Sequence, residues 1–405
     1  MMAETPANRA APSASSIIAI CFAITLLEGY DIQAIGVAAP KLAPSLHLAP
    51  AMLGLVFTGG MAGLVLGALT GGWLADKISR RPLLTAAVVL FGVSSILTAL
   101  ATTTMTLVAA RFLTGLGLGA ALPALINVAI EVSAPERRTR TVTTMFCGMP
   151  AGGALSGLFA VYAFQHFGWQ SIFVVGGVAP LLLVPFLLTL PETRSAPAAH
   201  AVRVPAATAL FGDRRAAVTL LLWVTFGLTL MILYMLLNWL PSLVASKNLA
   251  QVNGAQAGAQ AALAFNLASV GGSLAVGMLV DRFGLRLPVA AAYLGLVLGL
   301  MGLSAANGLI PILAWSGLAG FCLLGAQFCL YGAAPMYYPA ASRGLGTGAA
   351  IAIGRLGSIA GPMVAGQLVA VGIGASGVAM AMTPVVIAAG LAATAMATLG
   401  RREPN

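Results

Sequence analysis

The sequence predicts an all-α membrane protein with twelve transmembrane helices in two pseudo-symmetric six-helix halves. Three observations predict this fold: the composition, a series of apolar segments of spanning length, and an internal repeat. Of the 405 residues, 60% are hydrophobic and 7% are charged, whereas a soluble domain carries about 25% charged residues. A chain of this composition needs a lipid bilayer around it to cover its apolar surface.

Twelve apolar segments are long enough to cross a bilayer, which takes about 20 residues of helix. The first follows a polar tail, residues 1–15, and contains Glu28 and Asp31, so it is interpreted as a retained helix rather than a signal peptide. An Ala- and Pro-rich linker, 191–214, joins the halves 16–190 and 215–399, and residues 400–405 form a second tail. The predicted helices span residues 16–40, 51–75, 82–102, 105–131, 140–164, 169–190, 215–244, 256–281, 287–306, 309–336, 345–371 and 376–399.

An internal repeat indicates that the two halves are homologous. The stretch GWLADKISRR, Gly72–Arg81, recurs as GMLVDRFGLR, Gly277–Arg286, at the end of the second helix of each half. Two homologous halves around a central cavity are typical of transporters. Small residues four positions apart in these same helices predict close helix packing. They are Gly59, Gly63, Gly67 and Gly71 in the second helix and Ser269, Ser273 and Gly277 in the eighth.

The basic residues predict the orientation of the chain. Of the 20 Lys and Arg residues, 16 fall in the tails and in the loops on the same side as the tails, whereas only Lys41 and Lys247 fall in loops on the other side. Because loops rich in Lys and Arg stay in the cytoplasm, we expect both termini there and the chain in a bacterial-type cytoplasmic (inner) membrane. The basic residues form no single module, so we expect no nucleic-acid partner.

The cysteines and histidines do not predict a metal site or an enzyme. The cysteines lie in apolar segments and form no C-x-x-C pair, and the histidines lie in or near loops without metal-ligand spacing. No nucleophile–base pair or phosphate-binding loop is present. We therefore expect neither an enzyme nor a metal or cofactor. The residues concerned are Cys21, Cys147, Cys322, Cys329, His47, His166 and His200.

Four charged side chains lie deep within the apolar segments: Glu28, Asp31, Arg111 and Arg355. Such groups face a cavity and usually serve ion or substrate pathways. Glu28 and Asp31 are one turn apart on one helix face, where burial and mutual repulsion favour a proton on at least one of them. Arg111 needs an anionic partner, for which either carboxylate is a candidate. We expect these three residues to couple protons to transport; the alternative is a static ion pair.

Arg355 has no acidic residue near it in its own half, which indicates that a substrate carboxylate binds its guanidinium. Hydrogen bonding to backbone carbonyls is the alternative. Aromatic walls with a few polar groups are typical of small-molecule sites, although packing explains any single one of these residues equally well. The candidate binding residues beside Arg355 are Tyr30, Gln33, Asn127, Tyr234, Asn238, Trp239, Gln327 and Tyr331.

The motifs resemble the major facilitator superfamily over essentially the whole chain. Gly72–Arg81 is similar to its signature between helices 2 and 3, with Ser79 where Gly is usual, and Gly277–Arg286 is a degenerate copy. Two more motifs fit, RFLTGLGLG from Arg111 to Gly119 and PETR from Pro191 to Arg194. This resemblance implies a cytoplasmic gate in which Asp76 meets positive groups or the start of helix 11, where the dipole favours an anion. The gate residues expected are Asp76, Lys77, Arg80, Arg81, Glu131, Arg138, Asp281 and Arg282.

Within that superfamily the sequence resembles the aromatic acid:proton symporter family. The elements are EGYDIQAIGVAAP from Glu28 to Pro40, NWLP from Asn238 to Pro241 and GRLGSIAGP from Gly354 to Pro362. Glu28 stands where that family has Asp, as in its 3-hydroxyphenylpropionate-type branch. The resemblance implies a monomeric proton symporter that imports a small aromatic carboxylate, such as a hydroxyphenylpropionate or hydroxybenzoate, by alternating access and without a cofactor.

Other functions remain open from the sequence. GMPAGG, Gly148–Gly153, resembles the superfamily's antiporter motif and supports a drug:proton antiporter, although arginines in a cavity suit anions better than lipophilic cations. A symporter for another small organic anion and a sensor derived from a transporter are further alternatives. We interpret Gly148–Gly153 as a bend and packing element of its helix.

Overall fold

The computed structural model describes residues 13–75, 77–134, 138–190, 205–212, 215–247, 249, 252–339 and 342–399. Twelve spans in this part are long and apolar enough to cross a membrane, which confirms the predicted fold class. The helices are α1 (Ala14–Ser45), α2 (Pro50–Ala75), α3 (Arg80–Ala99), α4 (Thr104–Glu131), α5 (Arg138–Phe146), α6 (Gly148–His166), α7 (Gln170–Leu187), α8 (Ala206–Phe211), α9 (Ala216–Ala245), α10 (Gly254–Phe283), α11 (Arg286–Ala305), α12 (Leu309–Ala333), η2 (Ala334–Tyr337), α13 (Arg343–Ala370) and α14 (Ala375–Leu399).

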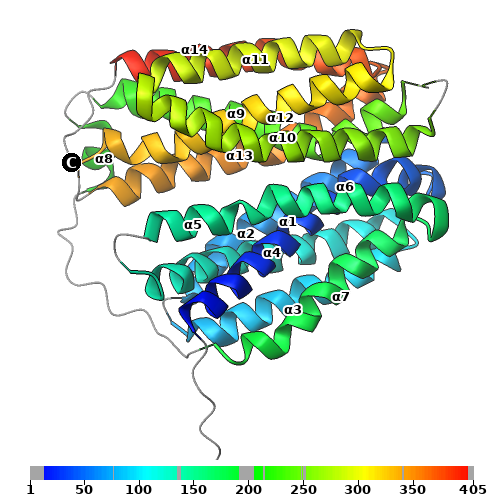
Figure 1. Cartoon of the computed structure of the whole chain (residues 1–405), viewed down its shortest axis with the longest axis horizontal. Helices are drawn as coiled ribbons and strands as arrows, with labels where there is room; N and C mark the ends of the chain where they lie inside the picture. The colour runs from blue at the N-terminus through cyan, green and yellow to red at the C-terminus, as the bar shows by residue number, and fades with distance from the viewer. Residues whose placement is uncertain are drawn as a thin grey trace, which may run out of the picture.

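The helices form two bundles that lie side by side, one of α1–α7 and one of α9–α14 (Figure 1). Successive spanning helices run in opposite directions, because short turns join most of them. We call the end at which α1 begins and α14 ends the near end, and the opposite end the far end. The near end lies on the left of Figure 1.

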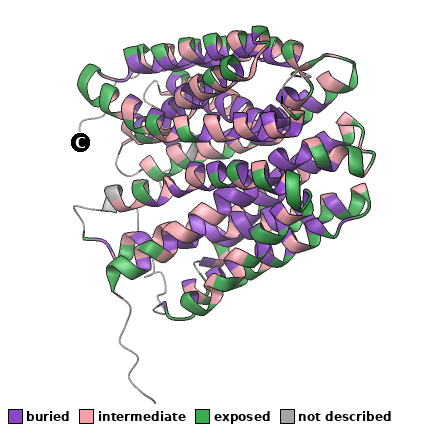
Figure 2. Cartoon of the chain, turned by 45° about the vertical axis from the view of Figure 1, so that its right-hand side comes forward, coloured by how far each residue is buried: buried purple, intermediate pink, exposed green. Residues whose placement is uncertain are grey.

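Buried and exposed side chains lie on different faces of the helices, and the exposed faces are apolar, as expected for a protein within a bilayer. Figure 2 shows buried residues on the helix faces that meet other helices and exposed residues on the outside of the bundles. Many outward-facing residues are large and apolar, for example Leu69, Leu182 and Ile310. Lipid tails cover such surface, so the outside of the bundles needs no polar face within the membrane.

Glycines bring α2 and α4 into backbone contact. A Cβ atom at Gly63 would overlap the carbonyl of Phe112, and one at Gly115 would overlap the carbonyl of Gly60. Membrane helices use small residues in this way because packing, rather than the hydrophobic effect, holds them together. The predicted packing stripe of α2 therefore does lie against a neighbour, and it fixes the helix that carries Arg111.

The corresponding prediction for the second half is wrong at Gly277. A Cβ atom there would meet no atom within 4 Å. Instead, α10 and α12 approach each other where Gly272 faces the Phe321 carbonyl and Gly320 faces the Phe265 carbonyl. α10 therefore contacts α12 through Gly272, which lies five positions before Gly277, the last residue of the predicted stripe.

Two local features differ from the predicted segments. The fifth segment is divided, because α5 ends at Phe146, Cys147 lies in a turn, and α6 begins at Gly148. Pro150 has no N–H to donate to the carbonyl of Phe146, which interrupts the helical hydrogen bonds there. The linker also contains α8, a short helix that the sequence did not predict.

The two halves meet each other in the far half of the bundle. A Cβ atom at Gly54 of α2 would lie 3.3 Å from Gly366 of α13. The rings of Phe57 on α2 and Trp239 on α9 pack edge-to-face with centroids 5.4 Å apart. Gly36 of α1 fits against the backbone of α9. These contacts close the far end between the halves.

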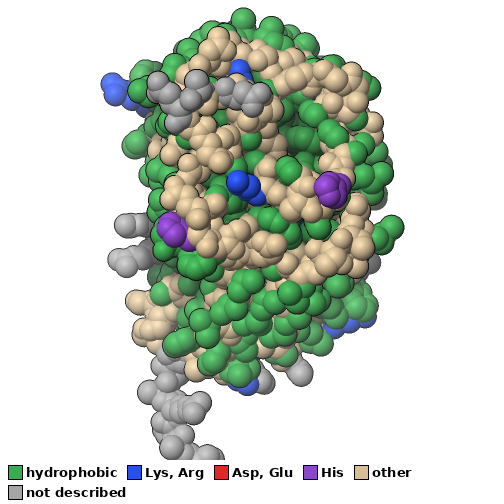
Figure 3. Space-filling model, turned by 90° about the vertical axis from the view of Figure 1, so that its right-hand side faces the viewer, with side chains coloured by type: hydrophobic (Ala, Val, Ile, Leu, Met, Phe, Trp, Pro, Cys, Tyr) green, Lys and Arg blue, Asp and Glu red, His purple; other side chains and the backbone are tan. Residues whose placement is uncertain are grey.

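The surface at the far end has a single sign of charge. Figure 3 shows this face, on which basic and histidine side chains appear and no acidic side chain is visible among the described residues. The sequence agrees, since the far-end segments contain Lys41, in the last turns of α1, and Lys247, after α9, but no Asp or Glu. Lys247 donates to the carbonyls of Ser304 and Ala306 at 2.9 and 3.0 Å, and burial lowers the pKa of its ammonium.

Candidate functional site

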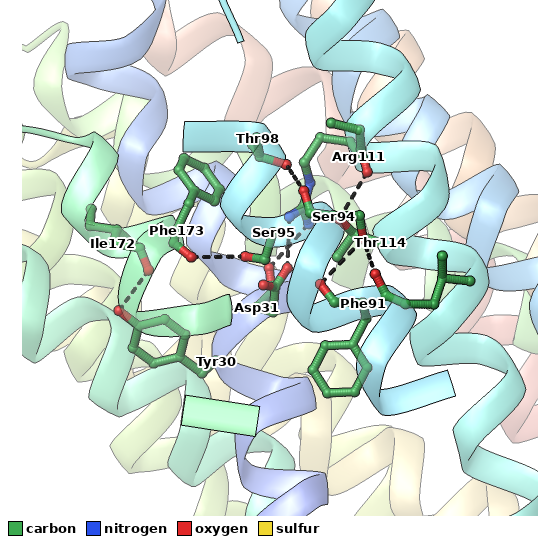
Figure 4. A network of polar contacts seen from close by, with 12 residues as sticks. Tyr30, Asp31, Phe91, Ser94, Ser95, Thr98, Arg111, Thr114, Ile172 and Phe173 are labelled. Atoms are coloured by element: carbon green, nitrogen blue, oxygen red, sulfur yellow. Dashed lines mark hydrogen bonds and ion pairs between the residues drawn. The ribbon is translucent and has the colours of Figure 1, made fainter. Parts of the chain in front are cut away.

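A buried ion pair lies at the centre of the first half. Arg111 on α4 donates from Nη1 to Oδ1 of Asp31 on α1 at 2.7 Å and from Nη2 to the Asp31 carbonyl at 3.1 Å. The two residues are 2% and 0% exposed. Figure 4 shows both side chains pointing toward each other between the helices. The guanidinium thus meets the carboxylate at one oxygen and the main chain of Asp31 at another, so that the two opposite charges compensate each other away from water.

Helices α3 and α7 complete the surroundings of Asp31. Oδ2 of Asp31 has no hydrogen-bond partner in the described part of the chain, and a Cβ atom at Gly176 of α7 would lie 3.1 Å from it and 3.3 Å from the hydroxyl of Ser95. The hydroxyl of Ser95 donates to the Phe173 carbonyl at 3.1 Å, as Figure 4 shows. Tyr30 points to the other side and its hydroxyl donates to a carbonyl of α7. One oxygen of the Asp31 carboxyl is thus left without a partner among the described residues, near a hydroxyl that donates elsewhere.

Glu28 lies one helical turn before Asp31 and has different surroundings. It is 0% exposed, and neither of its carboxyl oxygens has a hydrogen-bond partner among the described residues. Burying an ionised carboxylate without a partner is very costly, whereas the protonated acid is far cheaper to bury. The two carboxyls on this face of α1 therefore differ in their surroundings, since Asp31 has a guanidinium partner and Glu28 has no hydrogen-bond partner among the described residues.

Arg355 on α13 occupies the centre of the second half, where it contacts aromatic residues. Its Nη1 donates to the hydroxyl of Tyr234 on α9 at 3.1 Å, and Tyr331 on α12 lies within electrostatic range of the guanidinium. Phe226 packs edge-to-face on Tyr331 with ring centroids 5.3 Å apart. Arg355 forms no ion pair within the described residues, and Asp281, near the end of α10, is the one acid in the sequence between 215 and 399.

Other predicted binding residues have unused polar atoms or helix-packing contacts. Gln327 is 2% exposed, and both of its amide atoms lack partners in the described part of the chain. Asn238 donates to the Tyr234 carbonyl at 2.7 Å, and its side-chain oxygen has no partner among the residues that the structure describes. Trp239 donates to the Pro362 carbonyl at 2.9 Å, in the far-end contact. Asn127 is half-buried on α4.

Gln33 pairs with a residue that the sequence did not suggest. Its side-chain amide exchanges two hydrogen bonds with Asn266 on α10. Asn266 is one of several polar residues in α10, so nothing in the sequence singled it out, and its separation from Gln33 by 233 positions gave no sign of the pairing. The glycines at positions 148, 152 and 153 of α6 pack against α1. The stretch Gly148–Gly153, which resembles the antiporter motif, therefore serves helix packing in this structure.

The predicted gate is described in part. Asp76 lies outside the described residues, as does the side chain of Arg138. Arg80 and Glu131 form an ion pair that joins α3 to the end of α4. Lys77 lies over the ring of Trp73 at 3.7 Å, and Arg282 lies over its neighbour Phe283. Arg81 and Asp281 lie at the same near end, at the start of α3 and the end of α10.

Twelve spanning helices in two halves, with buried ionisable groups at the centre, define a multi-pass membrane transporter. The chain belongs to the Major Facilitator Superfamily, whose family model matches residues 21–362.

Characterised relatives and solved structures agree with this membership. The chain is 40% identical to the 3-(3-hydroxy-phenyl)propionate transporter of Escherichia coli strain K12. The alignment of 387 residues covers 94% of this chain and 94% of the relative. It is 32% identical to the gallate transporter of Pseudomonas putida, over 88% of this chain and 86% of the relative. A bacterial homologue of the human lysosomal transporter Spinster, in an inward-facing and unoccupied conformation, has the same fold, with a TM-score of 0.78 at 17% identity, covering 98% of this chain and all of that one.

Proposed function

We propose that this protein imports a small aromatic carboxylate together with protons across the cytoplasmic membrane. The observation that carries the proposal is Arg355, a guanidinium that contacts Tyr234 and lies near Tyr331 in a half whose sequence has almost no acids. A planar guanidinium binds a carboxylate through two parallel hydrogen bonds, and aromatic side chains beside it suit a ring. Both relatives described above are named for the transport of such acids.

Proton coupling is assigned to Glu28, Asp31 and Arg111. Glu28 is buried and has no hydrogen-bond partner within the described residues, so we assign the proton to it, whereas Asp31 pairs with Arg111. Protonation of Asp31 would release Arg111, and a proton would leave again when the carboxylate recovers its pair. The coupling thus depends on two acids that share a helix face but differ in charge.

The orientation follows from the distribution of basic residues. The near end, with both tails and most of the Lys and Arg residues, lies in the cytoplasm. The conformation described here, whose halves touch at the far end, is then closed to the outside. Arg80, Glu131 and Asp76 belong to a gate at the cytoplasmic end, and the protein acts as a monomer in the inner membrane.

Vesicle transport tests the proposal. Purified protein in proteoliposomes is given radiolabelled 3-(3-hydroxyphenyl)propionate, gallate, gentisate and 4-hydroxybenzoate, with and without an inward proton gradient. We expect accumulation of at least one acid above equilibrium with the gradient, and loss of accumulation when a protonophore collapses it. Exchange without accumulation would refute coupling, and no uptake of any acid in such a panel would refute the substrate class.

A further inference from the structure

The central polar contact between the two halves is a reciprocal pair of amides. Nε2 of Gln33 donates to Oδ1 of Asn266 at 2.9 Å, and Nδ2 of Asn266 donates to Oε1 of Gln33 at 2.6 Å. The residues are 5% and 1% exposed. Gln33 belongs to α1 in the first half and Asn266 to α10 in the second. Each amide therefore meets its donor and acceptor needs in the membrane interior by reaching across to the other half.

The backbone of α6 holds this amide pair from the side. A Cβ atom at Gly153 would overlap the amide group of Gln33 and approach Oδ1 of Asn266 to 2.7 Å. Nδ2 of Asn266 also donates to the carbonyl of Ala262 in its own helix at 2.8 Å. The orientation of the Asn266 side chain is thus fixed by α10, and only glycine at position 153 leaves room for the pair.

This contact differs in kind from the ion pair of Asp31 and Arg111. Those residues both lie in the first half, so separating the halves does not pull them apart. Gln33 and Asn266 lie on opposite sides of the contact between the halves. Opening the far end must move α1 and α6 away from α10, and both amide–amide hydrogen bonds must then break.

We propose that Asn266 is a positioning residue of the transport cycle, which acts through Gln33 to hold the halves together in the conformation closed at the far end. The inference rests on the proposed function only in so far as transport requires the far end to open. Interhelical hydrogen bonds in membranes contribute about 0.6 kcal/mol each. Loss of both bonds should therefore raise the ratio of open to closed far ends about sevenfold.

Distances between spin labels test this proposal directly. Labels at K41C on α1 and V371C after α13, both exposed at the far end, are introduced into the full chain with its four native cysteines replaced. Electron–electron double resonance is measured in nanodiscs without substrate or proton gradient. Asn266→Leu removes the amide pair from the second half, and Gln33→Met removes it from the first. Each variant should raise the ratio of the long-distance to the short-distance population about sevenfold over the parent. An unchanged distribution in the two variants would overturn the proposal.

Two further variants separate positioning from general stability. Ser273→Ala removes a hydrogen bond inside α10 alone, so it should leave the distance distribution unchanged. The exchanged pair Q33N/N266Q keeps two amides of the same total length and should return the distribution toward the parent. A role in folding alone would lower the thermal unfolding temperature of Asn266→Leu without changing these distances, which would also overturn the proposal.

The readout is independent of the substrate assignment. Because the distances are measured without any ligand, failure of the transport panel would leave the result intact. If Gln33 instead serves the substrate, Gln33→Met would raise KM for uptake while Asn266→Leu left both KM and the distances unchanged. That outcome would contradict the inference and leave the proposed function standing.

Discussion

Asp31 and Glu28 share one face of α1, yet their side chains have different partners. Asp31 has the guanidinium of Arg111 at 2.7 Å, whereas Glu28 has no partner for either oxygen among the described residues. The sequence predicted that the two acids and Arg111 belong together, because buried charges need partners. It left open which acid forms the pair, since the two acids are one helical turn apart and the sequence does not show how α4 is placed against α1.

The first prediction concerns Asp31→Asn. The amide keeps an oxygen for Arg111 but cannot exchange a proton, so we expect loss of gradient-driven accumulation with substrate exchange kept within about threefold, because exchange needs no net deprotonation. The measurement compares uptake under an imposed gradient with counterflow in the same proteoliposomes. Ser95→Ala, which removes the hydroxyl beside Asp31, is the control and should retain accumulation. Normal accumulation by Asp31→Asn would exclude this residue from coupling.

A second prediction concerns Arg355→Lys. Lysine keeps the charge but cannot form two parallel hydrogen bonds to a carboxylate. Charged hydrogen bonds contribute about 1.5–3 kcal/mol, so KM should rise about tenfold or more while the protein remains folded. Arg343→Lys, on the same helix but bonded to the Tyr338 carbonyl, is the matched control. Equal KM values for the two variants would argue against a substrate carboxylate at Arg355.

At the scale of helices, the sequence predicted the spans far better than their contact faces. Segment length and hydropathy follow directly from bilayer thickness, and all twelve segments correspond to helices. The faces depend on which neighbour each helix meets. The glycines of α2 were found because one stripe repeats every four residues, whereas the contact of α10 uses Gly272 and Gly320, which form no such repeat. The break at Cys147, by contrast, agrees with the interpretation of Gly148–Gly153 as a bend, because the missing N–H of Pro150 follows from the sequence alone.

A third prediction uses two glycines of α2. Gly63→Ala places a methyl group against the Phe112 carbonyl, and overpacking of this kind costs about 1–3 kcal/mol. The thermal unfolding temperature of the purified protein in detergent should fall. Gly72→Ala adds the same group on the same helix, where no atom lies within 4 Å, and should leave the temperature unchanged or raise it slightly. An equal effect of both substitutions would show that α2 and α4 are not held by this contact.

At the scale of the whole molecule, the sequence predicted two homologous halves but not how they meet. The repeat of Gly72–Arg81 at Gly277–Arg286 is a local pattern. It can be found by comparing the sequence with itself. The contact between the halves joins residues such as Gln33 and Asn266, which are 233 positions apart. No periodicity connects them, and the same sequence must adopt other arrangements of the halves during transport. Composition and the repeat therefore predict two six-helix halves. Which end of the molecule is closed between the halves follows only from the three-dimensional structure.

The acid-free far face, described with Lys41 and Lys247, has a kinetic consequence. A surface potential of one sign raises the local concentration of oppositely charged solutes and speeds their encounter. In the orientation proposed above, in which the far end faces outward, this potential would raise the concentration of an organic anion near that end. Dissolved salt would weaken the effect, since the screening length falls from about 10 Å at 0.1 M to about 3 Å at 1 M. Uptake at low substrate should therefore slow as ionic strength increases, while the maximal rate stays constant. Lys41→Gln should show a weaker dependence on salt in the same assay, and an identical dependence would mean that capture is governed by diffusion alone.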